Sequence, residues 1–538
     1  MFAPMLTRKT ALMFAAGLTL AGCNLAPKYV RPELSVPVTT PTGPAYAATD
    51  AAGAIMPADT SWEVFFTDDR LRRVIRTALE NNRDLRVAVA NVAQARAQYT
   101  VQRSNLFPTL AASGSATYQK SPFGAVGGGL AGGTGTGGTG TGGTGTGGTG
   151  TGGTGTGGTG TGGTGGTGGG TGGTGSSVVS SGRADIYSAN VGISAWQIDL
   201  FGRVRNLTQA QQEQYFAAEE NRNAAQVSLI AEIATQWLTM AADQDRLKIA
   251  RDTERAFGQT VKLTQDRFRI GIASELEVRQ ASTSYDQARS DIADATTLIA
   301  QDQNALNLLA GTTLTADMLP ARLDTTSPTL ENLPANLPSE VLLRRPDIAS
   351  AEHQLIAANA NIGAARAAFF PNISLTAAFG TISLGLSNLF GNGSQTWSVA
   401  PTVSQTLFDF GRNKGNLRYA QATRDAAVAT YEKSIQTGFR EVADALARRG
   451  TIGAQLQAQT SLRDNAAGAF RLSELRFRAG IDTFLNTLDS QRSLYTAQQS
   501  LLASRLTRDS NSVELYRALG GGITTAAPSD TRLPRQPN

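Results

Sequence analysis

One five-residue motif occurs twice in this chain, and its two copies constrain the fold more than any other feature. The segment 267–271 reads RFRIG, and 209 residues later the segment 476–480 reads RFRAG. Each copy lies between two long stretches with helical periodicity and without proline. A glycine directly after basic residues is typical of a helix end. The motif therefore predicts the turn of a helical hairpin, present once in each half of the chain.

Further matched segments indicate that the two halves arose by internal duplication. The tripeptide 410–412 repeats 201–203 (Phe-Gly-Arg) at the same spacing of 209 residues, whereas Phe-Pro at 370–371 repeats 107–108 at a spacing of 263. The change in spacing falls across a region that holds a long run of glycine and threonine. A duplication with one expanded loop accounts for both spacings, and such repeats define an architecture.

The lengths of the predicted helices indicate how each half is assembled. The stretch 204–268 would form a helix of roughly 100 Å, 274–310 one of roughly 55 Å, and 84–106 one of roughly 35 Å. Laid end to end, the two shorter helices nearly match the long one, so each half can place a long helix beside an interrupted one. Within 274–310, alanine and larger apolar residues recur every three or four positions, which is typical of helix-on-helix packing.

Four segments alternate between apolar and small polar residues, as β-strands do. They are 109–119, 187–195, 373–379 and 397–407. Tilted strands with one face toward lipid and the other toward water show this alternation over about 9–11 residues. Four strands cannot close a barrel, and open sheet edges are not tolerated in lipid. We therefore expect the chain to associate: two copies would supply eight strands and three copies twelve, and the pattern does not choose between them.

The glycine and threonine run lies between the first two strand segments. Residues 127–175 contain only these two amino acids, apart from Leu130 and Ala131. Such a segment has no apolar side chain to bury and a large backbone entropy to lose, so we expect a disordered loop. Lengthening a surface loop adds only roughly 0.6 kcal/mol per doubling, which allows the expansion.

The N-terminus has the features of a targeting segment. Arg8 and Lys9 precede the apolar run 11–20, which is too short to span a bilayer. The run ends in Leu-Ala-Gly-Cys, which resembles a bacterial lipobox, and Cys23 is the only cysteine of the chain. The pattern predicts acylation of Cys23, and Asn24 after it resembles lipoproteins of the outer membrane.

Composition excludes several classes of function. The net charge of +5 is small and no basic stripe with interleaved aromatics is present, so no nucleic acid partner is expected. One histidine (His353) and one cysteine cannot build a His/Cys metal site or a Cys-His nucleophile. The glycine-rich run contains no lysine and is not a phosphate-binding loop. We expect no enzyme activity and no cofactor.

These observations divide the chain into consecutive parts. They are the signal peptide (1–22), a lipidated extended tether (23–60), the first repeat (61–311, with a strand hairpin at 108–199 and a tip near 271), a linker (312–343), the second repeat (344–522, with a strand hairpin at 371–409 and a tip near 480) and a C-terminal tail (523–538).

Together the motifs resemble the TolC-type outer-membrane efflux family, in its NodT/OprM-like lipoprotein branch that serves RND pumps. The matching elements are the lipobox at Cys23, Trp62 with Phe65, and the segments 345–348, 369–371, 407–412, 476–480 and 488–492. The resemblance covers nearly the whole chain from Cys23 to Gly522. Only the length of the glycine and threonine loop departs from the family pattern.

The resemblance implies an α+β membrane protein that forms a homotrimer. Twelve strands, four from each chain, would form one outer-membrane β-barrel, and twelve helices would continue it as a periplasmic tunnel. The chain would be a passive duct for drugs and small toxic compounds. A periplasmic adaptor and an inner-membrane RND pump would be its partners.

The resemblance also places functional residues at the two hairpin turns. The adaptor would contact Arg267, Arg269 and Gly271 in the first turn and Arg476, Arg478 and Gly480 in the second. Acidic residues just past the turns would close the resting tunnel, which makes Glu277 and Asp489 the gate candidates. Their neighbours Gln280 and Asn486 are uncharged, so the sequence does not decide which residues form the constriction.

Other interpretations stay open. The turn arginines would also stabilise the C-terminal ends of their helices as solvated cations, and Glu277 and Asp489 would then belong to solvated helix faces. A TolC-like duct for type I protein secretion would use the same fold. A lipid-anchored coiled-coil scaffold without a pore is an alternative of another class, and the alternating strands argue against it.

Overall fold

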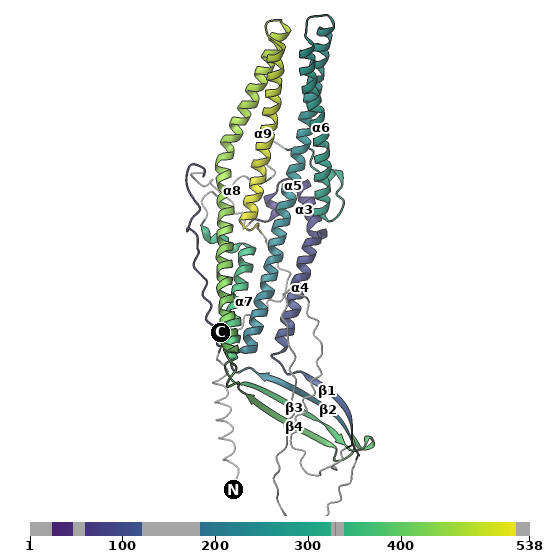
Figure 1. Cartoon of the computed structure of the whole chain (residues 1–538), viewed down its shortest axis with the longest axis vertical. Helices are drawn as coiled ribbons and strands as arrows, with labels where there is room; N and C mark the ends of the chain where they lie inside the picture. The colour runs from purple at the N-terminus through teal and green to yellow at the C-terminus, as the bar shows by residue number, and fades with distance from the viewer. Residues whose placement is uncertain (1–23, 47–59, 121–182, 324–328, 330–337, 523–538) are drawn as a thin grey trace, which may run out of the picture. The chain divides into compact units, whose positions relative to one another are not determined.

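The computed structural model describes residues 24–46, 60–120, 183–323, 329 and 338–522 (Figure 1). The chain divides into two compact units, one of helices and one of strands, and each is described by itself. The signal peptide, Cys23, the loop 127–175 and the tail 523–538 lie outside the described residues.

The helical unit contains two very long helices and several shorter ones. In chain order they are α2 (Trp62–Phe65), α3 (Asp69–Asn81), α4 (Arg83–Ser104), α5 (Arg203–Arg269), α6 (Glu275–Ala310), η2 (Ala316–Met318), η3 (Ser339–Arg344), α7 (Pro346–Ala367), α8 (Arg412–Arg478) and α9 (Phe484–Ala518). The long helices predicted from the sequence are therefore present, with ends within one or two residues of those expected. Among the described helices, none is both long enough and apolar enough to cross a membrane.

Each long helix packs against several shorter ones. Helix α5 packs against α4, α6, α7 and α9, and α8 packs against α7 and α9 (Figure 1). Both long helices begin directly after a left-handed glycine, Gly202 at φ 75° and Gly411 at φ 89°. A residue with a Cβ would be strained in that conformation, so glycine at these two positions allows the sharp entry into each helix.

Small residues bring the helices of the first hairpin close together. Ala281, Ala288 and Ala295 of α6 are fully buried, which matches the periodic pattern in the sequence. A Cβ placed on Gly258 of α5 would lie 3.2 Å from the ring of Tyr285. Close approach of the two backbones thus depends on side chains with little volume, and larger ones would force the helices apart.

The main core lies where the short helices meet the long ones. Phe65 and Phe66, at the start of the first repeat, contact Tyr516 near the end of the second, with ring centroids 4.5 and 5.7 Å apart. Leu71, Val74 and Ile75 of α3 are completely buried in the same core. A single apolar cluster therefore joins the beginning and the end of the folded chain.

The N-terminal segment 24–46 packs along the helices and is bound to α7 by several side chains. The carbonyl oxygens of Leu25 and Pro27 accept hydrogen bonds from Arg366 (3.2 Å) and Asn359 (2.7 Å) of α7. Further along, Arg31 forms a two-point ion pair with Glu352, at 2.8 and 3.0 Å. The extended backbone expected for this segment is thus held by side chains of α7.

The strand unit is a four-stranded sheet. Its strands are β1 (Leu110–Lys120), β2 (Arg183–Ile198), β3 (Asn372–Ser383) and β4 (Gln395–Ser404), in the order β1-β2-β3-β4. β1 and β2 are antiparallel, with Leu110 opposite Ile193 and Lys120 opposite Arg183. Pro401 lies in β4, an edge strand of the described sheet, where a missing N–H is tolerated.

Glycine permits close contact between β2 and β3. A Cβ on Gly192 would lie 2.4 Å from the carbonyl oxygen of Ala377, and one on Gly380 would lie 2.2 Å from that of Ala189. The contacts run in opposite directions along the two strands, so this pair is also antiparallel. The pairs β1–β2 and β3–β4 thereby form one continuous sheet.

Candidate functional site: the two hairpin tips

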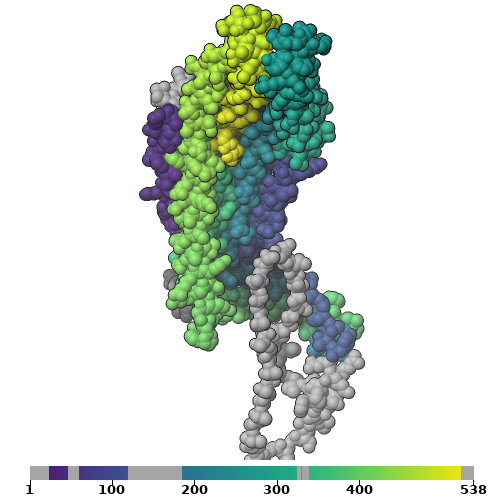
Figure 2. Space-filling model, turned by 45° about the horizontal axis from the view of Figure 1, so that its top comes forward, coloured from purple at the N-terminus to yellow at the C-terminus, as the bar shows by residue number. Residues whose placement is uncertain are grey.

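The first tip (residues 267–277) and the second tip (residues 476–489) lie side by side at one end of the helical unit (Figure 2). Both end their long helix in the same way. In the first tip the N–H of Ile272 donates to the carbonyl of Arg267 (3.0 Å) and that of Gly271 to Phe268 (2.9 Å). In the second tip, Ile481 and Gly480 make the equivalent bonds at 2.9 and 3.0 Å. This is the Schellman arrangement, which satisfies the last carbonyls of a helix.

The glycine of each tip is required by the backbone. Gly271 has φ 79° and Gly480 has φ 72°. No heavy atom lies within 4 Å of a Cβ built on either residue, so space is not the constraint. The repeated glycine in the sequence therefore reflects the left-handed turn that ends each helix.

Three of the four tip arginines pair with a carboxylate of their own hairpin. Arg269 contacts Asp266 at 3.0 Å, Arg478 contacts Glu474 at 2.6 Å, and Arg476 contacts Asp482 at 3.2 Å. The pairs are largely exposed, so each contributes little to stability. Their hydrogen-bond donors remain accessible to a partner.

The surfaces of the tips are also apolar. The exposed apolar side chains are Phe268, Ile270, Ile272 and Leu276 at the first tip and Ile481 and Leu485 at the second. Exposed apolar side chains that gather in one place mark an interaction surface. Beside them lie the arginines and their carboxylate partners, so each tip combines exposed apolar side chains with ion-paired groups.

The gate candidates lie beyond the turns. Glu277 is half-buried in the first turn of α6, where its N–H donates to the capping Ser274 hydroxyl at 3.3 Å. Asp489 is exposed on α9. Within the described residues, neither carboxylate forms an ion pair, so both are available to face other charges or a passing solute.

Below the tips, polar contacts of three α9 residues tie the hairpins together. Arg492 donates to the Ser284 hydroxyl (2.8 Å) and to the Gln280 carbonyl (3.5 Å), and Tyr495 donates to Asp291 (2.6 Å). Burial raises the pKa of Tyr495, and the hydrogen bond to Asp291 raises it further, so the phenol stays a donor. Sequence reasoning missed these pairs, because only Arg492 lay in a motif and its partner is 208 residues away. The third α9 residue is Gln491, whose side-chain oxygen accepts a hydrogen bond from the Thr260 hydroxyl at 3.5 Å.

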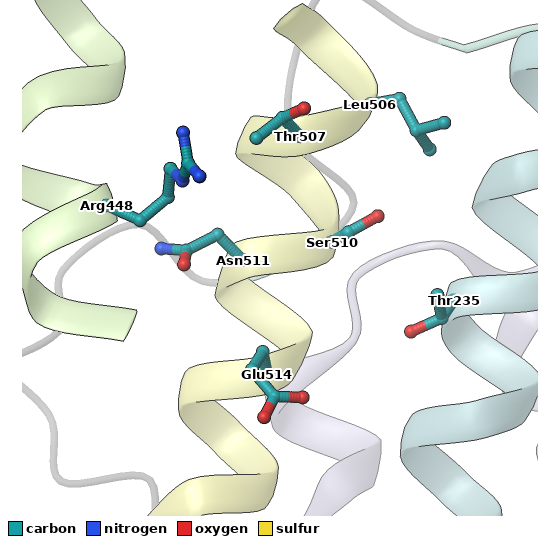
Figure 3. Close-up of a pocket in the computed structure, with 7 residues that line it drawn as sticks. All are labelled: Thr235, Arg448, Leu506, Thr507, Ser510, Asn511 and Glu514. Atoms are coloured by element: carbon teal, nitrogen blue, oxygen red, sulfur yellow. The ribbon is translucent and has the colours of Figure 1, made fainter. Parts of the chain in front are cut away.

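The described residues also include a shallow cavity of about 410 Å³ between the two long helices and α9 (Figure 3). It is lined by Thr235, Arg448, Leu506, Thr507, Ser510, Asn511 and Glu514. Asn511 donates to the carbonyl of Ala445 at 3.0 Å, so it serves the packing of α8 on α9. Within the described part of the chain, no group of three or more His, Cys, Asp or Glu residues could hold a metal ion. The tips remain the best candidate site.

The fold is that of solved outer-membrane channels. The open state of the Neisseria gonorrhoeae MtrE outer membrane channel matches with a TM-score of 0.76 and 33% identity, over 93% of this chain and 99% of that one. A CusC structure that concerns transmembrane channel formation matches with a TM-score of 0.75 and 32% identity, over 93% and 100% of the two chains.

The chain belongs to the outer membrane efflux protein family, whose model matches residues 74–150, 162–312 and 337–521. It is 40% identical over 518 residues to the toluene efflux pump outer membrane protein TtgC of Pseudomonas putida, covering 96% of each chain. It is 36% identical over 514 residues to the outer membrane protein OprJ of Pseudomonas aeruginosa, covering 95% of each. The family predicted from the sequence, and its efflux function in the outer membrane, are confirmed.

Proposed function

We propose that this chain is the outer-membrane duct of a tripartite RND-type efflux system. Drugs and small toxic compounds pass through it from a periplasmic adaptor and an inner-membrane pump to the exterior. The pair of hairpin tips with the same turn geometry carries this proposal, because it gives a channel-family protein a repeated apolar docking surface that is bordered by arginines. The duct itself is passive, and the pump supplies the energy.

The working form in this proposal is a homotrimer. The sheet of each chain has two edge strands, β1 and β4, within its described part. An open edge in lipid leaves backbone N–H and C=O groups without partners, so neighbouring copies must pair their edges. Three copies of four strands form a twelve-stranded barrel, and an even number of this size lies within the range of outer-membrane barrels.

In this proposal, acyl chains on Cys23 also anchor the protein in the outer membrane. Support comes from Leu25, whose carbonyl is bound by Arg366 close to the end of α7. The chain enters β3 only a few residues after this point. Leu25, two residues after Cys23 in the sequence, is therefore held by the last turn of α7.

The tips serve two roles in the proposal. The adaptor contacts the tips at Arg267, Arg269 and Gly271 and at Arg476, Arg478 and Gly480, together with the neighbouring apolar side chains. Glu277 and Asp489 narrow the resting passage. Docking of the adaptor would act on hairpins that are already connected by the Tyr495–Asp291 and Arg492–Ser284 contacts.

Drug susceptibility of a deletion strain tests the function directly. We expect lower minimal inhibitory concentrations for several unrelated antibiotics and for toluene, restored by the wild-type gene. A variant with Arg269→Ala, Arg476→Ala and Arg478→Ala should be present in the outer membrane at normal level and restore little. Unchanged susceptibility, with an exported protein missing from the medium, would instead support a type I secretion duct. Absence of single-channel conductance from the purified protein would support a scaffold without a pore.

A further inference from the structure

The two tips share a motif but differ in the contacts of one arginine. Arg267 and Arg476 occupy equivalent positions of the repeat. Arg476 pairs with Asp482, but the residue equivalent to Asp482 in the first hairpin is Ala273. Arg267 consequently has no carboxylate partner among the described residues, and its Nε is buried without a hydrogen bond.

Arg267 instead reaches across to the second hairpin. Its guanidinium carbon lies 4.6 Å from the centroid of the Phe477 ring. Phe477 is only 7% exposed and packs with Phe484 and Leu488 of α9 and with Phe257 of α5. The ring is therefore held in place by packing, and it presents a face to the cation.

Within the described residues, the second tip makes no equivalent contact with the first, between Arg476 and Phe268. Phe268 is the counterpart of Phe477 in the first hairpin, and it is 48% exposed. Its possible partner Arg476 is already bound to Asp482. The two tips thus carry the same Arg-Phe-Arg segment, but Ala273 in place of an Asp482 equivalent leaves Arg267 without the carboxylate that Arg476 binds.

We propose that Arg267 is a latch that positions the first tip against the second through the face of the Phe477 ring. The proposal rests on the proposed function and adds the regulation of its gate: the latch favours the arrangement in which the two tips of one chain stay together. Arginine suits this role because its planar, weakly hydrated cation stacks on aromatic faces and stays charged at any physiological pH.

The distance between the tips tests the latch. Spin labels on Lys262→Cys and Arg471→Cys, which are equivalent exposed positions on α5 and α8, report this distance in the full-length protein in detergent by double electron–electron resonance. A sample without the introduced cysteines gives the background. Arg267→Ala should increase the population with separated tips between about twofold and thirtyfold, the range that a cation–π contact supplies. Arg267→Lys, which keeps the charge without the planar group, should lie between the alanine variant and the wild type.

Two controls give the test its specificity. Arg255→Ala removes an exposed arginine of α5 that pairs with Asp252 of the same helix, and the distance should stay that of the wild type. Phe477→Leu keeps an apolar side chain without the ring and should reproduce the effect of Arg267→Ala. The double variant should then add nothing to either single change, because both remove one contact.

The proposed role of Arg267 would be contradicted if the label-to-label distance in Arg267→Ala equals that of the wild type. Additive effects in the double variant would also contradict it. Either result is distinguishable from failure of the proposed function. The labels report the tips whether or not the protein conducts, whereas a wild-type protein without conductance would contradict the duct itself. Circular dichroism of each variant shows whether the helices remain intact. If Phe477→Leu has a lower helical content, the distance measured for Arg267→Ala is by itself the test of the proposal.

Discussion

Asp302 is a buried carboxyl group between α5 and α6, and its environment raises its pKa. Burial raises the pKa of Asp302 to about 6, and the neighbouring Asp243 contributes by its negative charge and a hydrogen bond. Gln236 donates to the same carboxyl at 2.8 Å and opposes the shift. Arg246, on α5, faces Asp243. Between about pH 4 and pH 6, the Asp302 carboxyl is therefore protonated in the folded chain and ionised in the unfolded chain, where its pKa is about 3.9.

We predict that this pair weakens the fold as pH rises. Because the folded-state pKa of Asp302 is raised, its stabilising contribution is complete below about pH 4 and is lost as pH passes through about 6. Asp302→Asn should raise the thermal midpoint at pH 7.5 and leave it unchanged at pH 4, measured by circular dichroism. Asp252→Asn, at an exposed position of α5, is the control. Equal midpoints of Asp302→Asn and wild type at pH 7.5 would contradict the prediction.

A second residue-scale prediction concerns the passage. Glu277→Ala combined with Asp489→Ala should raise single-channel conductance in planar bilayers, because a ring of carboxylates at a constriction narrows it and binds cations. Asp252→Ala with Asp464→Ala removes two exposed carboxylates of α5 and α8 and should leave the conductance unchanged. If the two double variants conduct alike, Glu277 and Asp489 do not form the constriction.

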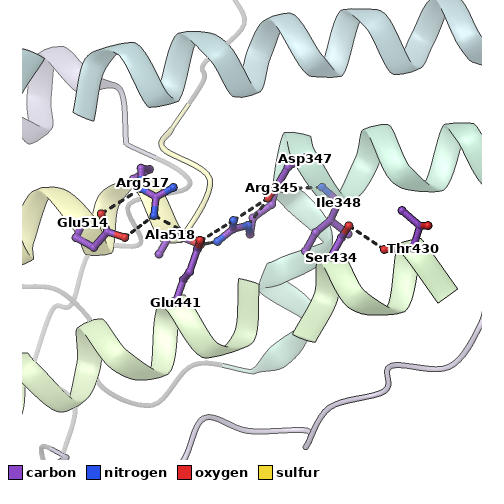
Figure 4. Close-up of polar contacts among 9 residues, drawn as sticks. All are labelled: Arg345, Asp347, Ile348, Thr430, Ser434, Glu441, Glu514, Arg517 and Ala518. Atoms are coloured by element: carbon purple, nitrogen blue, oxygen red, sulfur yellow. Dashed lines mark hydrogen bonds and ion pairs between the residues drawn. The ribbon is translucent and has the colours of Figure 1, made fainter. Parts of the chain in front are cut away.

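At the scale of elements, one buried arginine connects three helices (Figure 4). Arg345, at the start of α7, donates to the carbonyl of Ala518 at 2.6 Å, which caps the end of α9. Its remaining N–H groups bind Asp347 at 2.8 and 3.0 Å and Glu441 of α8 at 2.9 Å. Burial alone would raise the pKa of Asp347, but the bonds and charge of Arg345 outweigh it, and the pKa is lowered.

Loss of this arginine should be costly. Arg345→Ala removes the donor to Asp347 and to the Ala518 carbonyl, and it leaves Glu441 only Arg517, 3.5 Å away. Removing one member of a fully buried ion pair costs about 3–5 kcal/mol, and the partial exposure of both carboxylates places the expected cost below that range. We expect a clearly lower thermal midpoint by circular dichroism, with partial recovery in Arg345→Lys, which lacks the forked donor group. Arg424→Ala removes an exposed arginine of α8 that pairs with Asp425 and should change the midpoint little. A midpoint of Arg345→Ala equal to that of Arg424→Ala would refute this role.

Helices and strands could be predicted from the sequence because their signals are local. The heptad alanines of α6, the proline after α4 and the turn glycines each act on neighbouring residues, and all are in place. Contacts between the hairpins could not be predicted in this way. Tyr495 and Asp291 are 204 residues apart, and nothing in the sequence around either one indicates its partner. The contact of Arg267 with Phe477 could not be predicted either, because the absence of an Asp482 equivalent at Ala273 becomes visible only when the two tips are aligned.

At the scale of the whole molecule, anchoring and folding should be separable. Cys23→Ser should abolish acylation, seen as a loss of mass in the mature protein, and reduce the amount in the outer-membrane fraction. The helical content should persist, because Arg366, Asn359 and Glu352 hold the following segment without the lipid. Arg31→Ala is the matched variant: acylation should stay complete while the docked segment becomes easier to cleave by protease. Full acylation of Cys23→Ser would disprove Cys23 as the modified residue.

The Arg345 contact also marks an off-centre point along α8. Gly438 faces Arg345, and a Cβ on it would lie 3.2 Å from the guanidinium Nε. This point divides the helix Arg412–Arg478 into arms of about 40 Å and about 60 Å. If α8 tilts as a rigid rod about this contact, each degree moves the tip by about 1 Å and the other end by about 0.7 Å in the opposite direction.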